Sequence, residues 1–249
     1  MFSLQNKTAI VTGGGSGIGQ ATARLLAARG AQVVVADIDE DAARATAAEI
    51  STAAVVRVDV ADAASVEAMV AFAVERFGAL DWACNIAGIA PQPKPFVEHT
   101  YDDWHRTIEV NLSGVFFCMQ HELRQMVAQG RGGAIVNMSS GAGVVPAPGQ
   151  PQYTAAKHGV LGLTKQAAQE FAAAGIRVNA VLPGQTETAP MRAYLDAMPD
   201  GGEKMLRRLP MKRMATPLEI AQAVVWLCSD EASYVNGDSL VVDGGLITR

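Results

Sequence analysis

A tyrosine and a lysine stand four positions apart in the sequence YTAAK, at Tyr153 and Lys157, with only small residues between them. Residues i and i+4 share one face of an α-helix, so both side chains can reach the same point in space. A free phenol has a pKa of about 10 and is a poor base at neutral pH, but a neighbouring ammonium favours its ionised form. The spacing therefore indicates a proton-transfer pair, although an alanine-rich helix can carry both residues by chance.

A glycine-rich turn, TGGGSGIG, follows an apolar run near the amino terminus. Its glycines Gly13, Gly17 and Gly19 would allow a tight turn and a close approach of the backbone to a pyrophosphate. They would also aim the amino terminus of a helix, beginning near Ile18, at the negative charge. A tight corner between strand and helix also favours glycine for structural reasons, so the turn alone does not establish a nucleotide site.

Asp37 ends the next apolar run, 20 residues after Gly17. A carboxylate at this point can accept hydrogen bonds from both hydroxyls of an adenosine ribose. It would repel a 2′-phosphate, and no arginine or lysine lies between Gly13 and Gln20 to neutralise one. These features favour NAD over NADP. Asp37 could instead cap a helix or lie in solvent, and the adenosyl cofactors of methyltransferases use a similar turn and acid.

Alternating short strands and longer alanine-rich helices must position these residues. Runs rich in β-branched residues predict strands at residues 8–11, 32–36, 54–58, 82–85, 134–138, 177–181 and 239–242. The pattern predicts a single domain over residues 1–249, an α/β fold of the Rossmann type, with a doubly wound parallel sheet of about seven strands and helices on both faces. Gly30 should end the first helix, and TPLE at residues 216–219 is typical of a capping box.

Residues 185–215 interrupt this alternation with a segment marked by proline and by Gly201 and Gly202. Segments of this length in a compact domain often form lids. We predict a partly helical substrate lid that offers apolar side chains to the site, namely Met191, Tyr194, Leu195 and Met198.

Composition narrows the possible partners and locations. The 20 basic and 25 acidic residues give a net charge of −5, which leaves no basic field for nucleic acid or an anionic membrane. The sequence has no apolar run of about 20 residues, and its first residues lack a basic leader. The four histidines and three cysteines show no metal-ligand spacing. We therefore predict buried free thiols, a cytoplasmic protein and no metal site.

Several short motifs carry a resemblance to a known family. TGGGSGIG is followed in order by NIAG at 85–88, NMSS at 137–140, YTAAK, PGQTET at 183–188 and VDGG at 242–245. Over essentially its whole length the chain resembles the short-chain dehydrogenase/reductase family. Ile86 departs from the second asparagine of the usual NNAG motif, which weakens a structural detail only. The resemblance implies an oxidoreductase that moves a hydride between NAD(H) and a secondary alcohol or ketone.

The resemblance also implies catalytic roles. Tyr153 would be the general acid/base, and Lys157 would lower its pKa and hold the nicotinamide ribose. Ser140 would bind the substrate oxygen, with its neighbour Ser139 as the alternative that the family's spacing disfavours. Asn111 would support a water-linked proton path to the lysine.

Cofactor contacts are implied in the same way. The residues are Gly13, Gly15, Ser16, Gly17, Ile18, Gly19, Asp37, Asp59, Val60, Asn85, Ala87, Gly88, Tyr153, Lys157, Pro183, Gly184 and Thr188. Family members usually form tetramers or dimers by packing two long helices, so we predict a homotetramer.

The substrate is less well defined by the sequence. Residues 141–152 should line one wall of the site and contain no charged residue, which favours a neutral, moderately apolar or cyclic alcohol. One alternative is an NADP-dependent reductase of 3-oxoacyl thioesters, whose acyl carrier the basic run RRLPMKR could grip. A non-catalytic dinucleotide-binding sensor is another, although the joint presence of Ser140, Tyr153 and Lys157 speaks against it.

Overall fold

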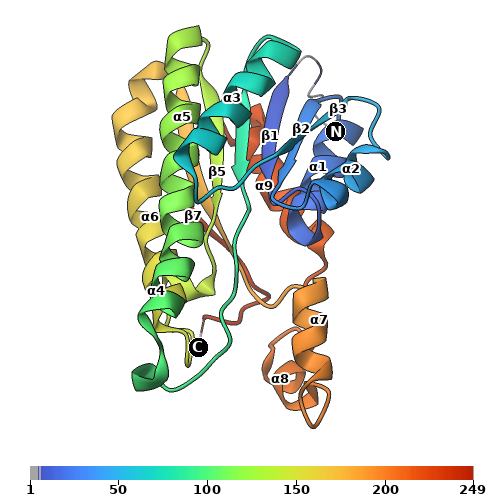
Figure 1. Cartoon of the computed structure of the whole chain (residues 1–249), viewed down its shortest axis with the longest axis vertical. Helices are drawn as coiled ribbons and strands as arrows, with labels where there is room; N and C mark the ends of the chain where they lie inside the picture. Colours follow the sequence, from blue (N-terminus) through green and yellow to red (C-terminus); the bar gives the residue numbers. More distant parts are fainter. Residues whose placement is uncertain (1–4, 6, 249) are drawn as a thin grey trace.

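The sheet determines where the functional residues can meet. The computed structural model describes residue 5 and residues 7–248, and in that part of the chain seven strands form one parallel sheet in the order β3-β2-β1-β4-β5-β6-β7 (Figure 1). The strands are β1 (Thr8–Thr12), β2 (Gln32–Asp37), β3 (Ala53–Arg57), β4 (Trp82–Asn85), β5 (Gly133–Met138), β6 (Ile176–Pro183) and β7 (Ser239–Val242). The predicted fold class is confirmed.

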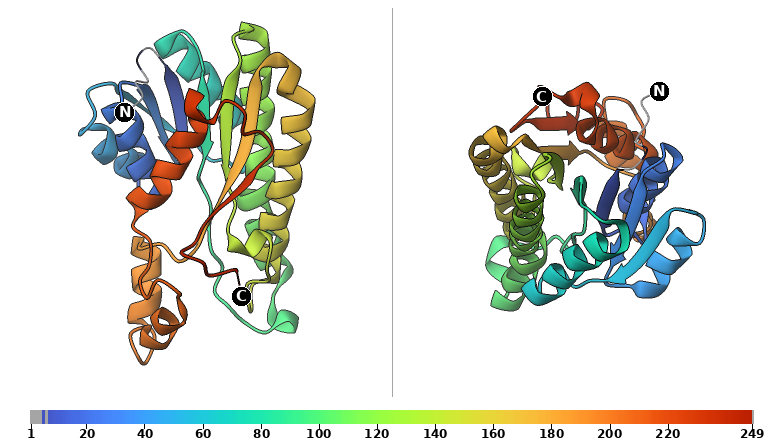
Figure 2. Two further views of the ribbon diagram at one scale, coloured as in Figure 1. Left: turned by 180° about the vertical axis from the view of Figure 1, so that it is seen from behind. Right: turned by 90° about the horizontal axis from the view of Figure 1, so that it is seen from above.

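Helices cover both faces of the sheet (Figure 2). On one face lie α1 (Gly17–Ala28), α2 (Glu40–Ala47) and α9 (Pro217–Cys228), which share one apolar core. On the other lie α3 (Ala63–Phe77), α5 (Gly114–Gln129) and α6 (Pro151–Phe171), which share a second core. The short helix α4 (Tyr101–Ile108) contacts α6 and runs through a π-helical turn, Glu109–Ser113, into α5.

The residues of strand β2 show why a layer of helices must cover each face of the sheet. Val33, Val34 and Val35 are fully buried. Side chains alternate along a strand, so Val33 and Val35 join the core under α1 and α9, whereas Val34 joins the core under α3 and α5. A continuous apolar run is therefore typical of a parallel strand covered on both sides.

The ends of the helices follow the local signals in the sequence. Thr216 and Glu219 form the predicted capping box at the start of α9, with Pro217 at the first helical position. Gly30 follows α1 with a φ of 100°, a conformation that favours glycine. The three cysteines are buried and free, as predicted. No helix among the described residues is both long and apolar enough to cross a membrane.

The predicted excursion after β6 contains two short helices, α7 (Ala189–Asp196) and α8 (Glu203–Arg208), which stand apart from the sheet (Figure 1). Its two ends meet where Thr186 bridges Ala215, and the amide of Glu187 donates to the Ala215 carbonyl at 2.8 Å. Leu195 is buried against Gly202, so this side chain belongs to the packing of the segment itself.

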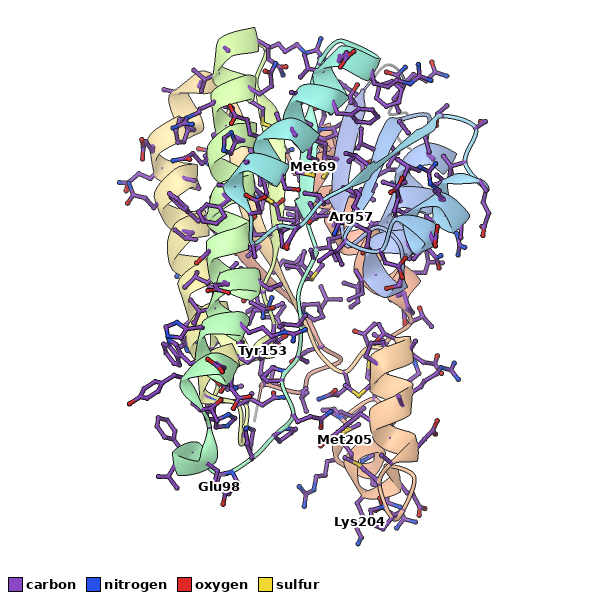
Figure 3. The ribbon with its side chains drawn as sticks, in the orientation of Figure 1. Arg57, Met69, Glu98, Tyr153, Lys204 and Met205 are labelled. Atoms are coloured by element: carbon purple, nitrogen blue, oxygen red, sulfur yellow. The ribbon has the colours of Figure 1, made fainter. Side chains whose placement is uncertain are left out.

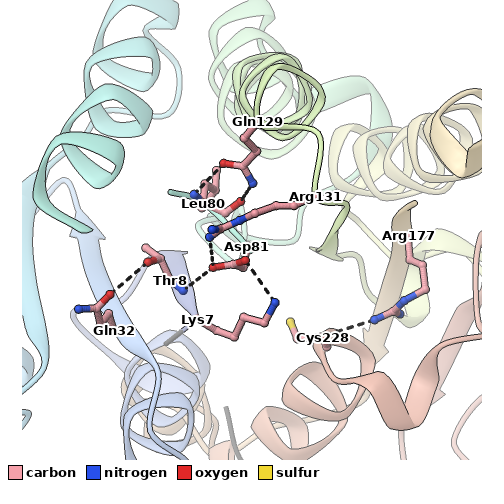
Figure 4. Close-up of polar contacts among 9 residues, drawn as sticks. All are labelled: Lys7, Thr8, Gln32, Leu80, Asp81, Gln129, Arg131, Arg177 and Cys228. Atoms are coloured by element: carbon pink, nitrogen blue, oxygen red, sulfur yellow. Dashed lines mark hydrogen bonds and ion pairs between the residues drawn. The ribbon is translucent and has the colours of Figure 1, made fainter. Parts of the chain in front are cut away.

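Two charged side chains satisfy backbone groups that the sheet leaves open (Figure 4). The Asp81 carboxylate accepts from the amide of Thr8 at 2.8 Å and pairs with Arg131 at 2.9 Å. Arg177, from β6, donates to the carbonyls of Leu227 at 2.7 Å and Cys228 at 3.2 Å, at the carboxyl end of α9. Buried carbonyls at a helix end need such donors.

We expect Arg177→Ala to lower the free energy of unfolding by about 2–3 kcal/mol, since several carbonyls lose a charged donor. Urea denaturation would measure the change. The control is Arg24→Ala, which removes an exposed ion pair with Glu49 and should change stability little. Equal effects of the two substitutions would contradict the capping role of Arg177.

Candidate active site

The site lies at the carboxyl ends of the strands. The strand order reverses between β1 and β4, and crevices in doubly wound sheets form at such a reversal. The glycine turn leaves β1 here, and the chain segments that follow β4, β5 and β6 carry the other predicted site residues.

Close backbone packing explains the glycines of the turn. A Cβ on Gly13 would lie 3.0 Å from the backbone of Ala87, and a Cβ on Gly19 would lie 2.0 Å from the carbonyl oxygen of Gly13. Gly17 has a φ of 52°, in the left-handed region. The turn therefore requires glycine. Without side chains, its backbone can approach a ligand closely.

The turn also fits a pyrophosphate. Ser16 precedes α1, and within the described residues its side chain makes no capping hydrogen bond and the first turn of α1 holds no acidic residue. The amides at this helix terminus can therefore meet an anion. Thr188 packs against Gly17, because a Cβ there would lie 3.1 Å from the Thr188 methyl group, so the segment after β6 reaches the glycine turn.

Asp37 stands beside this turn at the end of β2. Its Oδ2 accepts from the amide of Gly15 at 2.9 Å, and its Oδ1 accepts from the amide of Asp39 at 3.0 Å. Asp39, not Asp37, caps α2 by accepting from the amide of Ala42. The capping alternative for Asp37 is therefore removed, and its carboxylate fits the ribose-binding position.

The remaining cofactor positions lie where the chain leaves β3, β4 and β6. Asp59 turns the chain after β3 by accepting from the amide of Ala61, and Val60 packs against Gly114. A Cβ on Gly88 would lie 2.8 Å from Oδ1 of Asn111, so Gly88 adjoins one of the predicted catalytic residues. Two further positions, Pro183 and Gly184, close β6.

Asn85 turns its side chain away from the crevice. Its side chain is 2% exposed and points inward, donating to Glu122 at 2.9 Å and to Asn137 at 3.0 Å. Only its backbone is left for a dinucleotide. The motif NIAG identifies the turn after β4, but the sequence does not state which face of the strand each residue occupies.

Tyr153 and Lys157 share one face of α6, as the spacing predicts. The ammonium of Lys157 lies 5.5 Å from the centroid of the Tyr153 ring and donates to the carbonyl of Met138, at the end of β5, at 2.9 Å. Ser140 hydrogen-bonds Tyr153 through its side chain. Ser139 instead donates to the backbone carbonyl of Lys157 at 2.9 Å, which leaves Ser140 as the serine that meets the phenol.

Burial controls the ionisation of both groups. It raises the pKa of Tyr153, and the hydrogen bond from Ser140 opposes this rise. It lowers the pKa of Lys157 to about 8. The predicted lowering of the Tyr153 pKa by Lys157 is absent from this arrangement, because desolvation outweighs any effect of the ammonium, which is bonded to the end of β5. The Tyr153 phenol is therefore neutral at pH 7.

Asn111 lies in the π-helical turn between α4 and α5 and is fully buried. Its Oδ1 accepts from the amide of Ile89 at 3.2 Å, and its Nδ2 donates to the carbonyls of Ile89 and Thr107, both at 3.0 Å. The asparagine therefore fastens the loop after β4 to the helix. Turns of the π type often mark functional sites.

Sequence reasoning missed two buried polar residues below this site. The hydroxyl of Thr12 accepts from the amides of Ile86 at 3.0 Å and Ala87 at 3.2 Å, which fixes the turn after β4. Glu122 is fully buried on α5. A polar residue within an otherwise apolar buried face was the available signal in both cases.

The segment with α7 and α8 lies at the same end of the molecule as Tyr153 (Figure 3). Among the described residues, no three His, Cys, Asp or Glu side chains are grouped so that they could hold a metal ion. The doubly wound sheet, the glycine turn with its acid, and the Ser140, Tyr153 and Lys157 cluster together define an oxidoreductase of the Rossmann type.

Comparisons with known proteins agree with this class. A family model described as enoyl-(acyl carrier protein) reductase matches residues 13–247. The chain is 48% identical to cis-4-hydroxycyclohexanecarboxylate dehydrogenase of Sinomonas cyclohexanicum, over 98% of this chain and 97% of the relative. It is 44% identical to 2,5-dichloro-2,5-cyclohexadiene-1,4-diol dehydrogenase of Sphingobium indicum, over 98% of both chains.

A solved structure gives the same result. The crystal structure of levodione reductase has a TM-score of 0.92 and 36% sequence identity, and the match covers 98% of both chains. The protein belongs to the short-chain dehydrogenase/reductase family, as the sequence motifs predict. It is an oxidoreductase with a nicotinamide dinucleotide as its cofactor.

We expect Gly19→Ala to abolish dinucleotide binding, because the new methyl group would overlap the Gly13 carbonyl. Titration followed by nicotinamide fluorescence would measure binding. Gly162→Ala is the matched control, since a Cβ there meets nothing within 4 Å and alanine suits a helix interior. Wild-type affinity in Gly19→Ala would contradict the close packing of the turn.

Proposed function

We propose that this protein is an NAD-dependent dehydrogenase that interconverts a ring-bearing secondary alcohol and the corresponding ketone. The observation that carries the proposal is the placement of Ser140, Tyr153 and Lys157 together at the mouth of the dinucleotide crevice. The names of the two curated relatives add that proteins of this sequence type act on hydroxylated six-membered rings.

The bound dinucleotide supplies a carbon that accepts or donates the hydride. The residues of the protein transfer the proton to or from the substrate oxygen. Tyr153 donates its phenolic proton to the oxygen of a ketone during reduction and removes the hydroxyl proton of an alcohol during oxidation. Ser140, already bonded to the phenol, holds the substrate oxygen in line with it. Lys157 holds the nicotinamide ribose and stabilises negative charge that forms on Tyr153.

The choice of NAD rests on Asp37. Its carboxylate lies 2.9 Å from the amide of Gly15, at the place where a ribose would meet the end of β2. A 2′-phosphate at that place would bring two negative charges together. We therefore propose that Asp37 accepts both ribose hydroxyls and excludes NADP.

We propose that residues 185–215 form the lid over the substrate and that residues 141–152 form the opposite wall. The wall contains no charged residue. The nearby cation Lys94 is engaged by Asp103 at 2.6 Å. These features support a neutral or weakly polar ring as the part of the substrate that this wall contacts.

We also propose a cytoplasmic homotetramer. Helices α5 and α6 leave an apolar groove on the outside of the molecule, and Phe116 in it is 44% exposed. The groove is lined by Leu112, Ser113, Phe116, Phe117, Gly159 and Leu163. A second copy of the same helices can cover this exposed apolar surface.

A reductase of 3-oxoacyl thioesters is the second candidate; the description of the matching family model, enoyl-(acyl carrier protein) reductase, shares with it the acyl carrier. The basic run near α8 would have to hold an acidic carrier. Much of its charge is already engaged, since Arg207 pairs with Glu203 at 2.5 Å and Arg213 with Glu219 at 2.6 Å. This pairing makes the acyl-carrier reading the weaker one.

We expect the purified protein to reduce NAD with cyclohexanol-type alcohols, measured by the absorbance of the reduced cofactor. Burial raises the pKa of Tyr153, so the phenolate needed for oxidation becomes more abundant as pH rises. Oxidation should therefore quicken from pH 7 towards alkaline pH, while ketone reduction, which uses the neutral phenol, should persist at pH 7. Dinucleotide binding without turnover of any alcohol or ketone would identify a sensor instead.

We expect Asp37→Ala to reduce the preference for NAD over NADP by about tenfold or more, because it removes both the ribose contact and the repulsion. The ratio of kcat/KM values for the two cofactors would measure it. Asp39→Ala, two residues away, is the control and should keep the wild-type ratio. Wild-type protein that already prefers NADP would end the assignment.

A further inference from the structure

A buried carboxyl group lies below the active site without any role in the chemistry described so far. Glu122, on α5, is fully buried, and its Oε2 accepts from Nδ2 of Asn85, on β4, at 2.9 Å. Leaving an ionised carboxylate in such a place with a neutral amide as its partner would be strongly unfavourable. The protonation state of Glu122 therefore needs a structural explanation.

Two buried oxygens, which we call the orphan oxygens, have no hydrogen-bond partner in the described part of the chain and indicate that Glu122 is protonated. Within residue 5 and residues 7–248, neither Oε1 of Glu122 nor Oδ1 of Asn85 has a hydrogen-bond partner, and both are buried. A carboxylic acid and an amide pair through two hydrogen bonds, amide N–H to acid oxygen and acid O–H to amide oxygen. The first of these bonds is present, and the two orphan oxygens are the atoms that the second would join. One proton on Glu122 satisfies both.

The pair continues into a buried polar chain. Nδ2 of Asn85 also donates to Oδ1 of Asn137, on β5, at 3.0 Å, and Nδ2 of Asn137 donates to the hydroxyl of Thr164, on α6, at 3.0 Å. That hydroxyl in turn donates to the carbonyl of Val160 at 2.8 Å. The chain thus joins α5, β4, β5 and α6 inside the protein.

Each of these elements carries a part of the active site. Asn85 is followed by the turn with Gly88, which adjoins Asn111 and Lys157. Asn137 precedes Met138, whose carbonyl holds the ammonium of Lys157. Thr164 lies two turns beyond Lys157 on the same helix. A change in this run of buried hydrogen bonds would therefore move the groups that hold the cofactor and the phenol.

We infer that Glu122 is a neutral carboxylic acid that shares its proton with Asn85, and that this acid–amide pair is a positioning device which holds the ends of β4 and β5 beneath the catalytic residues. Glu122 does not touch substrate or cofactor; it acts through Asn85 and Asn137.

The surroundings agree with a neutral acid. Burial raises the pKa of Glu122 to about 8, and the hydrogen bond from Asn85 opposes the rise. The titratable groups that face it are the thiols of Cys118, one turn earlier on α5, and of Cys84 on β4, and both thiols have raised pKa values. The buried residues that α3 and α6 contribute to this core include Met69 and Val160, which carry no charge.

The stability of the protein should depend on pH because Glu122 binds its proton more tightly in the folded than in the unfolded state. The unfolded chain releases the Glu122 proton near pH 4.5, whereas the folded protein keeps it up to about pH 8. Unfolding between these limits releases a proton, so Glu122 makes the wild-type protein progressively less stable as pH rises through this window. A glutamine can form both bonds with Asn85 and cannot ionise, so it lacks this effect.

The test compares Glu122→Gln with the wild-type protein and with Glu170→Gln, which alters an exposed carboxylate on α6. The infrared carbonyl band of a protonated carboxylic acid should be present at pH 7 in the wild type and in Glu170→Gln and absent from Glu122→Gln. The melting temperature of Glu122→Gln relative to the wild type should rise steadily between pH 5 and pH 8. Absence of the band, or a constant difference in melting temperature, would overturn the neutral acid.

A kinetic measurement tests the positioning role, and this part alone rests on the proposed function. Glu122→Met, which makes neither bond, should lower kcat/KM about tenfold or more, the scale of a small misplacement, whereas Glu122→Gln should stay near the wild-type value. Wild-type kinetics in Glu122→Met would overturn the role. If Glu122→Met does not fold, the kinetics of Glu122→Gln test the positioning role instead. Because this variant keeps both hydrogen bonds, it should keep wild-type turnover. Loss of turnover with intact dinucleotide binding would overturn positioning through these two bonds.

Discussion

The hydrogen bond from the ammonium of Lys157 to the carbonyl of Met138 joins the catalytic helix to the last residue of a central strand. Strand β5 lies between β4 and β6 in the sheet, so its end is fixed by neighbours on both sides. Through this bond, the position of Tyr153 on α6 depends on the register of the sheet. The loop after β4 is held from two sides, by Thr12 at the end of β1 and by Asn111 in the turn between α4 and α5.

Desolvation is the other constraint on the site. It raises the pKa of Tyr153, lowers that of Lys157 to about 8 and raises that of Glu122 to about 8, so at pH 7 the phenol and the carboxylic acid are neutral while Lys157 keeps its ammonium. The interior therefore presents a neutral phenol that can donate a proton to a ketone. A dry site also strengthens each remaining polar contact, so a buried oxygen without a partner among the described residues, such as Oδ1 of Asn85, is costly there.

Much of this site could be predicted from the sequence, because its strongest signals are local. The spacing of Tyr153 and Lys157 specifies a shared helix face, and the glycine turn and Asp37 follow strands that are recognisable by composition. The inward orientation of Asn85 and the burial of Glu122 could not be predicted, since they depend on which faces of β4 and α5 meet. The raised pKa of Tyr153 was missed for the same reason: the helical spacing gives proximity, but the balance between an ammonium and desolvation requires the surrounding packing.

The central claim is that the Tyr153 phenol carries the proton between the chain and the substrate oxygen. The direct measurement is the steady-state rate of alcohol oxidation by Tyr153→Phe, beside Tyr101→Phe, which changes a tyrosine that is 86% exposed. The account predicts that kcat/KM falls about a hundred- to ten-thousand-fold in Tyr153→Phe, with dinucleotide affinity retained, and stays at the wild-type value in Tyr101→Phe. Wild-type oxidation rates in Tyr153→Phe would contradict it.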